Sequence, residues 1–353
     1  MIIFGATRGE RAVTDDDFQR LLVTIGAMSP AQMMALEAAI RGRLKAPPPP
    51  PVDASEAAIE AAEQTESAAK AATDCASVAD IEARFAAAPR CPHCKGTAIG
   101  KWGSANGLKR YRCKPCKITF NALTGTPLAQ LHKRDLWAGH AQALVDGISL
   151  RKVADRLDVD LTTAFRWRHR FLRAPKAVKA KVLQGTVEAD ETYFLYSEKG
   201  SRQLERPARK RGGKAAKRGL SAKQDPVLIA RDRHHATTDQ ILADRSTKSI
   251  SAVLEPIVAK SAVLVSDGAQ TYRAFANAAN ILHVSLNLSA GERTWGIYHI
   301  QNVNNYGSRL KTWMRRFNGV ATKYLDSYLG WQRINDREGN TLDANRILTA
   351  AWG

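Results

Sequence analysis

The chain has 353 residues, 44% of them hydrophobic, with 53 Lys and Arg against 34 Asp and Glu and a formal net charge of +19. This length allows two or three domains with at least one sizeable core. The basic excess favours a polyanionic partner, because each neutralised phosphate releases condensed counterions. No run of about 18 apolar residues is present to span a membrane. The N-terminus lacks the features of a signal peptide, so we expect a cytoplasmic protein.

The first 85 residues predict a small helical unit and a linker. Apolar residues recur at helical spacing between residues 14 and 45, and Ser29 with Pro30 forms a start signal for the second helix. We therefore expect a helical hairpin over residues 1–45, whose role the sequence does not disclose. A Pro/Ala-rich linker is predicted over 46–85, because this stretch has too little apolar surface to offset the entropy of ordering.

Four cysteines in two CxxC pairs predict a zinc ribbon over residues 86–126. Cys91 and Cys94 are separated by 18 residues from Cys113 and Cys116. Each pair offers two thiolates from one tight turn, and four thiolates leave no open position for water, so the Zn²⁺ is expected to be structural. The alternative, four buried thiols, fits this spacing poorly. Lys109, between the pairs, is expected to touch DNA phosphate.

Residues 127–178 predict a helix-turn-helix. Apolar spacing over 148–157, a short turn at 158–160 and a basic helix over 161–172 match that motif. The alternative is two amphipathic helices that pack on the next domain. A basic second helix after a zinc ribbon favours DNA binding. The residues expected to meet bases or phosphates are Thr162, Thr163, Arg166 and Arg170.

Residues 179–340 alternate strand-like and helix-like segments, which predicts an α/β catalytic domain with a mixed sheet flanked by helices. Asp190 would project from a strand over 185–194, and a buried apolar strand ends at Asp267. Carboxylates at the ends of neighbouring strands meet in space and can hold a divalent ion. Glu188 shares the strand face of Asp190, whereas Glu191 is expected to point to the opposite face.

A helix that follows His299 carries two further candidates. Asn304 and Lys311 are seven residues apart and so share one helix face. Asn302 competes with Asn304 for a ligand role, and Glu292 offers a carboxylate from an apparent loop. From these residues alone, a helix-surface or helix-capping role is the preferred interpretation of Asn304.

A basic segment, residues 199–223, interrupts this domain with ten Lys or Arg against one Glu. It is interpreted either as a solvated loop or as a clamp on DNA through Arg209, Lys210 and Arg211. Residues 341–353 are expected to form a C-terminal tail.

Three sequence stretches together make the pattern more specific. VEADETYF (187–194), LVSDG (264–268) and HIQNVNNYGSRLKTWMRRFNGVATKYLDSYLGW (299–331) follow the cysteine pattern. With it they resemble insertion-sequence transposases of the zinc-ribbon-bearing DDE class. They resemble in particular the subgroup with Asn in place of the final Glu and a Lys seven residues later. The resemblance covers roughly residues 88–335.

The resemblance implies an RNase H-like fold with Asp190, Asp267 and Asn304 as catalytic triad and Lys311 as an accessory basic residue. It implies Mg²⁺- or Mn²⁺-dependent hydrolysis at transposon ends and attack of the freed 3′-OH on target DNA. The partners would be double-stranded DNA and at least a second copy of the chain in the synaptic complex, in a bacterial nucleoid.

Asn offers one neutral oxygen, so the second ion would be held less tightly than by Glu. Two alternatives to a transposase remain. One is a non-catalytic DNA-binding regulator, and the other is a structure-specific nuclease on the same scaffold.

Overall fold

The computed structural model describes residues 77–204, 206–207, 221 and 223–353. The predicted hairpin over 1–45, most of the predicted linker, and Arg209, Lys210 and Arg211 lie outside the described residues. The chain divides into two units, one formed by residues 1–53 with 294–297 and the other by residues 54–293 with 298–353. Of the first unit only Thr294–Ile297 is described, with strand β9 (Thr294–Trp295).

The second unit begins with a helix on a small antiparallel sheet. Its elements are α4 (Val78–Ala87), β1 (Ile99–Ala105), β2 (Leu108–Cys113) and β3 (Thr119–Phe120). Phe85 of α4 packs on Tyr111 at 5.1 Å between ring centroids. Helix α4 therefore occupies residues that the sequence assigns to the predicted linker, which runs to residue 85. The helix is stabilised by this tertiary contact, which the local composition does not reveal.

The helix-turn-helix prediction is confirmed. The segment comprises η1 (Arg134–Leu136), α5 (Trp137–Val145), α6 (Leu150–Leu157), α7 (Leu161–Phe171) and α8 (Arg173–Ala177). Asp158 adopts a left-handed conformation with φ 48° at the end of α6, which turns the chain sharply into α7. Val153 and Ala164 are fully buried between the two helices.

The following domain is built on a five-stranded mixed sheet, as the sequence predicts. Its order is β6-β5-β4-β7-β8, with β4, β5 and β6 antiparallel and β4, β7 and β8 parallel. The strands are β4 (Thr186–Leu195), β5 (Gln224–Asp232), β6 (Thr237–Ile241), β7 (Val263–Ser266) and β8 (Leu282–Ser285). A further short strand, β10, covers Tyr298–His299, and a 3₁₀ turn, η2, covers Leu288–Ala290.

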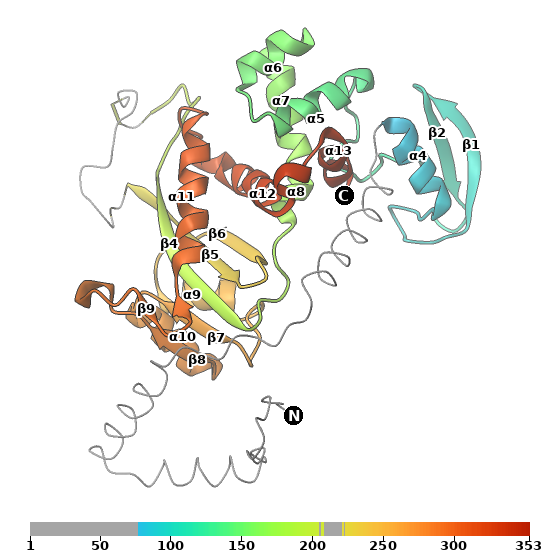
Figure 1. Ribbon diagram of the computed structural model, residues 1–353. Helices are drawn as coiled ribbons and strands as arrows, with labels where there is room; N and C mark the ends of the chain where they lie inside the picture. The colour runs from blue at the N-terminus through green and yellow to red at the C-terminus, as the bar shows by residue number, and fades with distance from the viewer. Residues whose placement is uncertain (1–76, 205, 208–220, 222) are drawn as a thin grey trace, which may run out of the picture. The chain divides into compact units, whose positions relative to one another are not determined.

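Helices cover both faces of this sheet (Figure 1). On one face α9 (Thr247–Leu254) and α10 (Gln270–Ala279) bury Val187 and Ala189 in an apolar core. Strand residues alternate between faces, so Glu188 and Asp190 face the other side, where α11 (Gln301–Arg315) lies. The buried Gly307 of α11 lies against Ile229 of β5, at a distance where a Cβ would make ordinary van der Waals contact.

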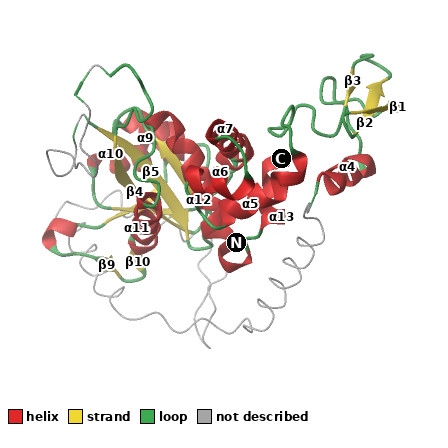
Figure 2. Cartoon of the chain, turned by 90° about the horizontal axis from the view of Figure 1, so that it is seen from above, coloured by secondary structure: helices red, strands yellow, loops and turns green. Residues whose placement is uncertain are grey.

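The C-terminal helices join this domain to the helix-turn-helix (Figure 2). They are α12 (Thr322–Glu338), η3 (Gly339–Thr341) and α13 (Ala344–Trp352). The buried Trp331 indole donates to the Leu144 carbonyl at 3.1 Å. The sequence predicts a tail over 341–353, but α13 is an ordered helix whose buried Ile347 and Leu348 contribute to its packing on α5. Within the described ranges, no helix is long and apolar enough to cross a membrane.

Candidate active site and DNA-binding elements

The two candidate aspartates lie on neighbouring strands. Asp190 is near the middle of β4, where Glu188 pairs with Val265 of the parallel strand β7. Continued by two residues, that register brings Asp190 beside Asp267, which directly follows the end of β7. The carboxylate pair predicted from the strand pattern is therefore brought together at the sheet.

Helix α11 adds the other two candidates to the same place. Asp190, Asn304 and Lys311 line one cavity of about 260 Å³, whose remaining walls include Ile229, Val303 and Gly307. Asn304 and Lys311 are exposed on one face of α11, as their spacing predicts. The cavity is thus lined by residues of β4, β5 and α11, and Asp267 lies next to Asp190 at its edge of the sheet.

Electrostatics at Asp190 indicate a site suited to a cation. Burial raises the pKa of the Asp190 carboxyl to about 6, and the negative charges of Asp267 and Glu191 act in the same direction. The hydrogen bond from the Glu191 amide, at 2.7 Å, and the positive charge of Lys311 oppose this shift. Burial also lowers the pKa of Lys311. Two partly buried carboxylates with an amide oxygen beside them form a donor set that fits a hard divalent ion.

The two glutamates that flank Asp190 have different partners. Glu191 points to the opposite face, as expected, where its carboxylate accepts from the Tyr272 hydroxyl at 2.7 Å and pairs with Arg245 at 3.1 Å. Glu188 faces α11 and accepts hydrogen bonds from Asn302. Neither carboxylate is solvated.

The competing ligand candidates are differently engaged. The Asn302 amide donates to Glu188 at 3.0 Å, and Glu292 is exposed on a loop, where it accepts from the Asn287 amide at 3.3 Å. His299 Nε2 lies 2.7 Å from an Arg233 nitrogen. Of the three, none lines the cavity that Asp190 and Asn304 share.

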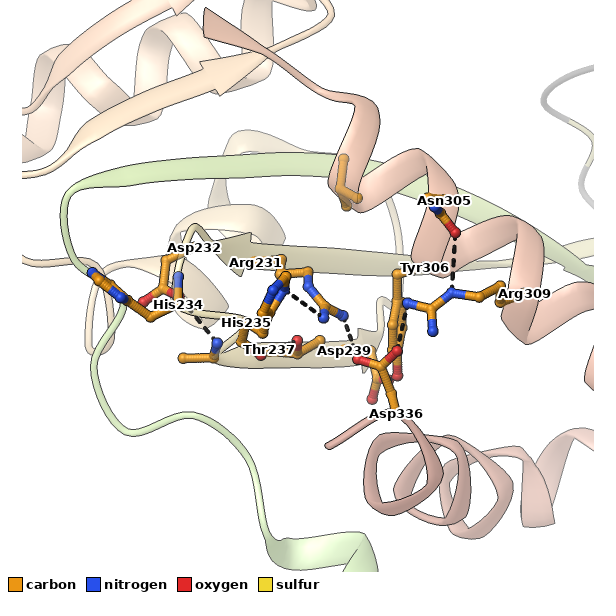
Figure 3. Close-up of polar contacts among 12 residues, drawn as sticks. Arg231, Asp232, His234, His235, Thr237, Asp239, Asn305, Tyr306, Arg309 and Asp336 are labelled. Atoms are coloured by element: carbon orange, nitrogen blue, oxygen red, sulfur yellow. Dashed lines mark hydrogen bonds and ion pairs between the residues drawn. The ribbon is translucent and has the colours of Figure 1, made fainter. Parts of the chain in front are cut away.

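A buried polar network fixes the body of α11 to the sheet and to α12 (Figure 3). The Tyr306 hydroxyl donates to Asp239 at 2.6 Å, and Arg231 lies over the Tyr306 ring. Asp336 of α12 accepts a hydrogen bond from Arg231 and forms an ion pair with Arg309 of α11, each at 2.5 Å. The helix that carries Asn304 and Lys311 is therefore held along its length.

One cation of the basic insertion has a structural partner that the sequence does not reveal. The Lys199 ammonium donates to the carbonyls of Phe317, Asn318 and Gly319 at 3.1, 3.2 and 2.7 Å. These carbonyls follow the end of α11, where a positive charge is favourable. Lys199 thus ties the start of the insertion to α11.

The four cysteines of the ribbon converge. Their sulfur atoms all lie within 4.8 Å of one another, with Cys91 and Cys116 at 3.6 Å and Cys94 and Cys113 at 3.4 Å. These are free thiols. Tetrahedral zinc with Zn–S bonds of about 2.3 Å would separate the sulfurs by about 3.8 Å, so the group fits a Zn²⁺ ion.

The residues predicted to contact DNA differ in their availability. Thr162, Arg166 and Lys109 are exposed, and Thr163 is half-buried. Arg170 is engaged within the protein, because its guanidinium donates to the carbonyls of Pro127 at 2.5 Å and Ala129 at 2.6 Å. The DNA-contact prediction for Arg170 is corrected accordingly: helical spacing placed it beside Arg166, but the segment after the ribbon covers it.

Two segments of the chain match known protein families, and one relative covers most of the chain. Residues 182–332 match the model of the ISXO2-like transposase domain, and residues 133–175 match a homeodomain-like domain. A relative from Halobacterium salinarum, named "Uncharacterized protein in transposable element ISH50", is 29% identical over 243 residues, which are 68% of this chain and 82% of the relative.

Among solved structures the likeness is weak. A chain of the simian T-cell lymphotropic virus intasome in complex with a PP2A regulatory subunit is 9% identical over 56% of this chain and 68% of its own, with a TM-score of 0.28. A pre-cleavage Mos1 transpososome is 11% identical over 61% and 79%, with a TM-score of 0.22. Residues 182–332 are similar to the ISXO2-like transposase domain and residues 133–175 to a homeodomain-like domain, and on these sequence matches the chain is a DNA transposase.

Proposed function

We propose that Asp190, Asp267 and Asn304 hold Mg²⁺ or Mn²⁺ and that the site cuts phosphodiester bonds at transposon ends and joins the 3′-OH to target DNA. The observation that carries this proposal is the shared cavity of Asp190, Asn304 and Lys311, with Asp267 brought beside Asp190 by the strand register. The match to a transposase domain over these residues supports it.

When bound, such ions would stabilise charge on the attacking and leaving oxygens at phosphorus. The chain's own residues do the rest. Lys311, on the same helix face as Asn304, binds a phosphate oxygen and orients the strand across the cavity. Asn304 contributes a neutral oxygen. The protein therefore neutralises less of the positive charge of the bound ions than it would with a carboxylate at this position.

An RNase H-like fold, belonging to the subgroup with Asp, Asp, Asn and a following Lys, is part of the same proposal. Three antiparallel strands joined to two parallel ones, with helices on both faces, support it. The cysteine cluster is proposed to hold structural Zn²⁺, supported by the agreement between the sulfur separations and tetrahedral geometry.

DNA contacts are proposed for the exposed residues of the ribbon and of α7. Thr162, Thr163 and Arg166 lie on the first turns of the second helix, the position that enters the major groove in a helix-turn-helix. Lys109 on β2 would bind phosphate. The basic insertion, with Arg209, Lys210 and Arg211, stays a proposed clamp on DNA. Pairing of two ends would need at least two copies of the chain.

Binding and cleavage can be measured separately. Asp190→Ala should abolish cleavage of a duplex that carries the element's end while leaving the affinity for that duplex unchanged, because a metal ligand is removed and no phosphate contact is lost. Loss of both activities together would contradict this assignment. Cleavage of flaps or junctions in preference to transposon ends would favour a structure-specific nuclease. Binding of the ends without cleavage in either Mg²⁺ or Mn²⁺ would favour a DNA-binding regulator.

A further inference from the structure

Glu188 is a buried carboxylate with an unusually complete set of donors. Its side chain is 1% exposed and faces α11. One oxygen accepts from the backbone amides of Asn302 at 2.8 Å and Val303 at 3.0 Å, and the other accepts from the Asn302 side chain at 3.0 Å. The carboxylate thus receives three hydrogen bonds from the first turn of one helix.

Those two backbone amides are donors that a helix cannot satisfy by itself. Helix α11 begins at Gln301, and its N-cap residue, Ile300, offers no side-chain hydrogen bond. A cap from strand β4 replaces the local Ser, Thr or Asp that helix starts normally use. The negative charge also complements the positive end of the helix dipole. The position at which α11 begins therefore depends on Glu188.

A second layer stabilises the buried charge. An Arg233 nitrogen lies 3.3 Å from Glu188, and His299 Nδ1 lies 3.5 Å from it. His299 Nδ1 accepts from the Gln301 amide at 3.2 Å, and its Nε2 lies 2.7 Å from an Arg233 nitrogen. The positive charge of Arg233 offsets the cost of burying the Glu188 carboxylate.

We infer that Glu188 is a positioning residue that sets the separation between Asp190 and Asn304, and that Asn302 is part of this anchor and not a metal ligand. Glu188 and Asp190 are two residues apart on one strand face, about 7 Å along the strand. Asn304 is two residues beyond Asn302, and its amide makes a helical bond to Ile300 at 3.1 Å. Strand β4 therefore carries Asp190, a proposed metal ligand, and also Glu188, which anchors α11. Helix α11 in turn carries Asn304, another proposed ligand.

The inference rests on the proposed metal site, and Mn²⁺ affinity of the full-length protein tests it without DNA. Calorimetry, with the signal of Asp190→Ala subtracted, should show about tenfold weaker Mn²⁺ binding for Glu188→Gln, the loss typical when a partner of a ligand is altered. Activity should need correspondingly more Mn²⁺, with the rate at saturating metal largely restored. A merely structural role would lower the melting temperature without moving the metal response.

Glu338→Gln provides the matched control. Glu338 is also a buried, ion-paired glutamate, with Arg346 at 2.8 Å, but it lies at the end of α12 and packs toward α13. The same chemical change there should cost stability and leave Mn²⁺ affinity unchanged. Equal Mn²⁺ affinity in Glu188→Gln and Glu338→Gln would overturn the inference.

Two isosteric substitutions on α11 give effects of opposite sign and serve if Glu188→Gln does not fold. Asn304→Asp adds a carboxylate to the proposed site and should tighten Mn²⁺ binding. Asn302→Asp places a second carboxylate against Glu188 and should weaken Mn²⁺ binding. Tighter binding by Asn302→Asp would make Asn302 a ligand and overturn the inference. If Asp190→Ala leaves Mn²⁺ binding of the protein intact, the proposed metal site itself is wrong, which is a separate outcome.

Discussion

Asp190→Asn should make the metal-free protein more stable at neutral pH, and the gain should shrink on acidification. The pKa of Asp190 rises from 3.8 to about 6 in the folded protein, chiefly through burial. Folding therefore favours the protonated carboxyl. Stability from this preference is fully present below pH 4 and is lost as the pH rises through about 6.

The size of the effect follows from that shift. Two pKa units correspond to roughly 3 kcal/mol, at about 1.4 kcal/mol per unit, as an upper bound for the penalty above pH 7. At pH 5 the native carboxyl is still mostly protonated, so about half of the penalty remains. Asn keeps the oxygen that accepts from the Glu191 amide but carries no charge at any pH. The expected gain is therefore about 1–3 kcal/mol at pH 8 and about half that at pH 5.

Urea unfolding at pH 5 and pH 8, with Mg²⁺ and Mn²⁺ omitted, measures this difference. Chelators must be left out, because they would also compete for metal at the cysteine cluster. Asp244→Asn is a control of opposite sign, since hydrogen bonds from Ser246 and Ser249 lower the pKa of Asp244 to about 2. That variant should be less stable than wild type at both pH values. An Asp190→Asn protein that is no more stable than wild type at pH 8 would refute the reasoning.

Four further substitutions test other parts of the chain. Cys94→Ser should reduce zinc content and weaken end binding before it affects the active site, and unchanged zinc content by atomic absorption would contradict a four-thiolate site. Gly330→Ala should cost at least about 2 kcal/mol in thermal unfolding, because its Cβ would lie 2.6 Å from the Lys176 Cα; full stability would mean that α12 and α8 separate readily. Arg166→Ala should weaken DNA binding and flatten its salt dependence, whereas Arg170→Ala should mainly lower stability; the reverse pattern would exchange their roles.

The strands, the helix-turn-helix and the grouping of the candidate site residues could be predicted, because each depends on a local sequence pattern. Alternation along β4 separated Asp190 from Glu191, and the seven-residue spacing put Asn304 and Lys311 on one face of α11. These periodicities follow from backbone geometry alone, so one chain suffices to see them.

The sequence did not reveal features that depend on contacts between distant segments. Glu188 caps a helix that begins more than a hundred residues later, and Lys199 binds carbonyls at the far end of the same helix. Arg170 looked available because the segment that covers it is remote in the sequence. The α13 helix likewise owes its order to packing on α5, which composition does not reveal.

Strand joining tests the central claim most directly. The purified protein would be incubated with a pre-nicked duplex that carries its element's end, a supercoiled plasmid, and Mg²⁺ or Mn²⁺. We expect joined product with wild type and none with Asp190→Ala, with equal end binding by both. Tight end binding by wild type with no joined product in either metal would contradict a catalytic site at Asp190, Asp267 and Asn304.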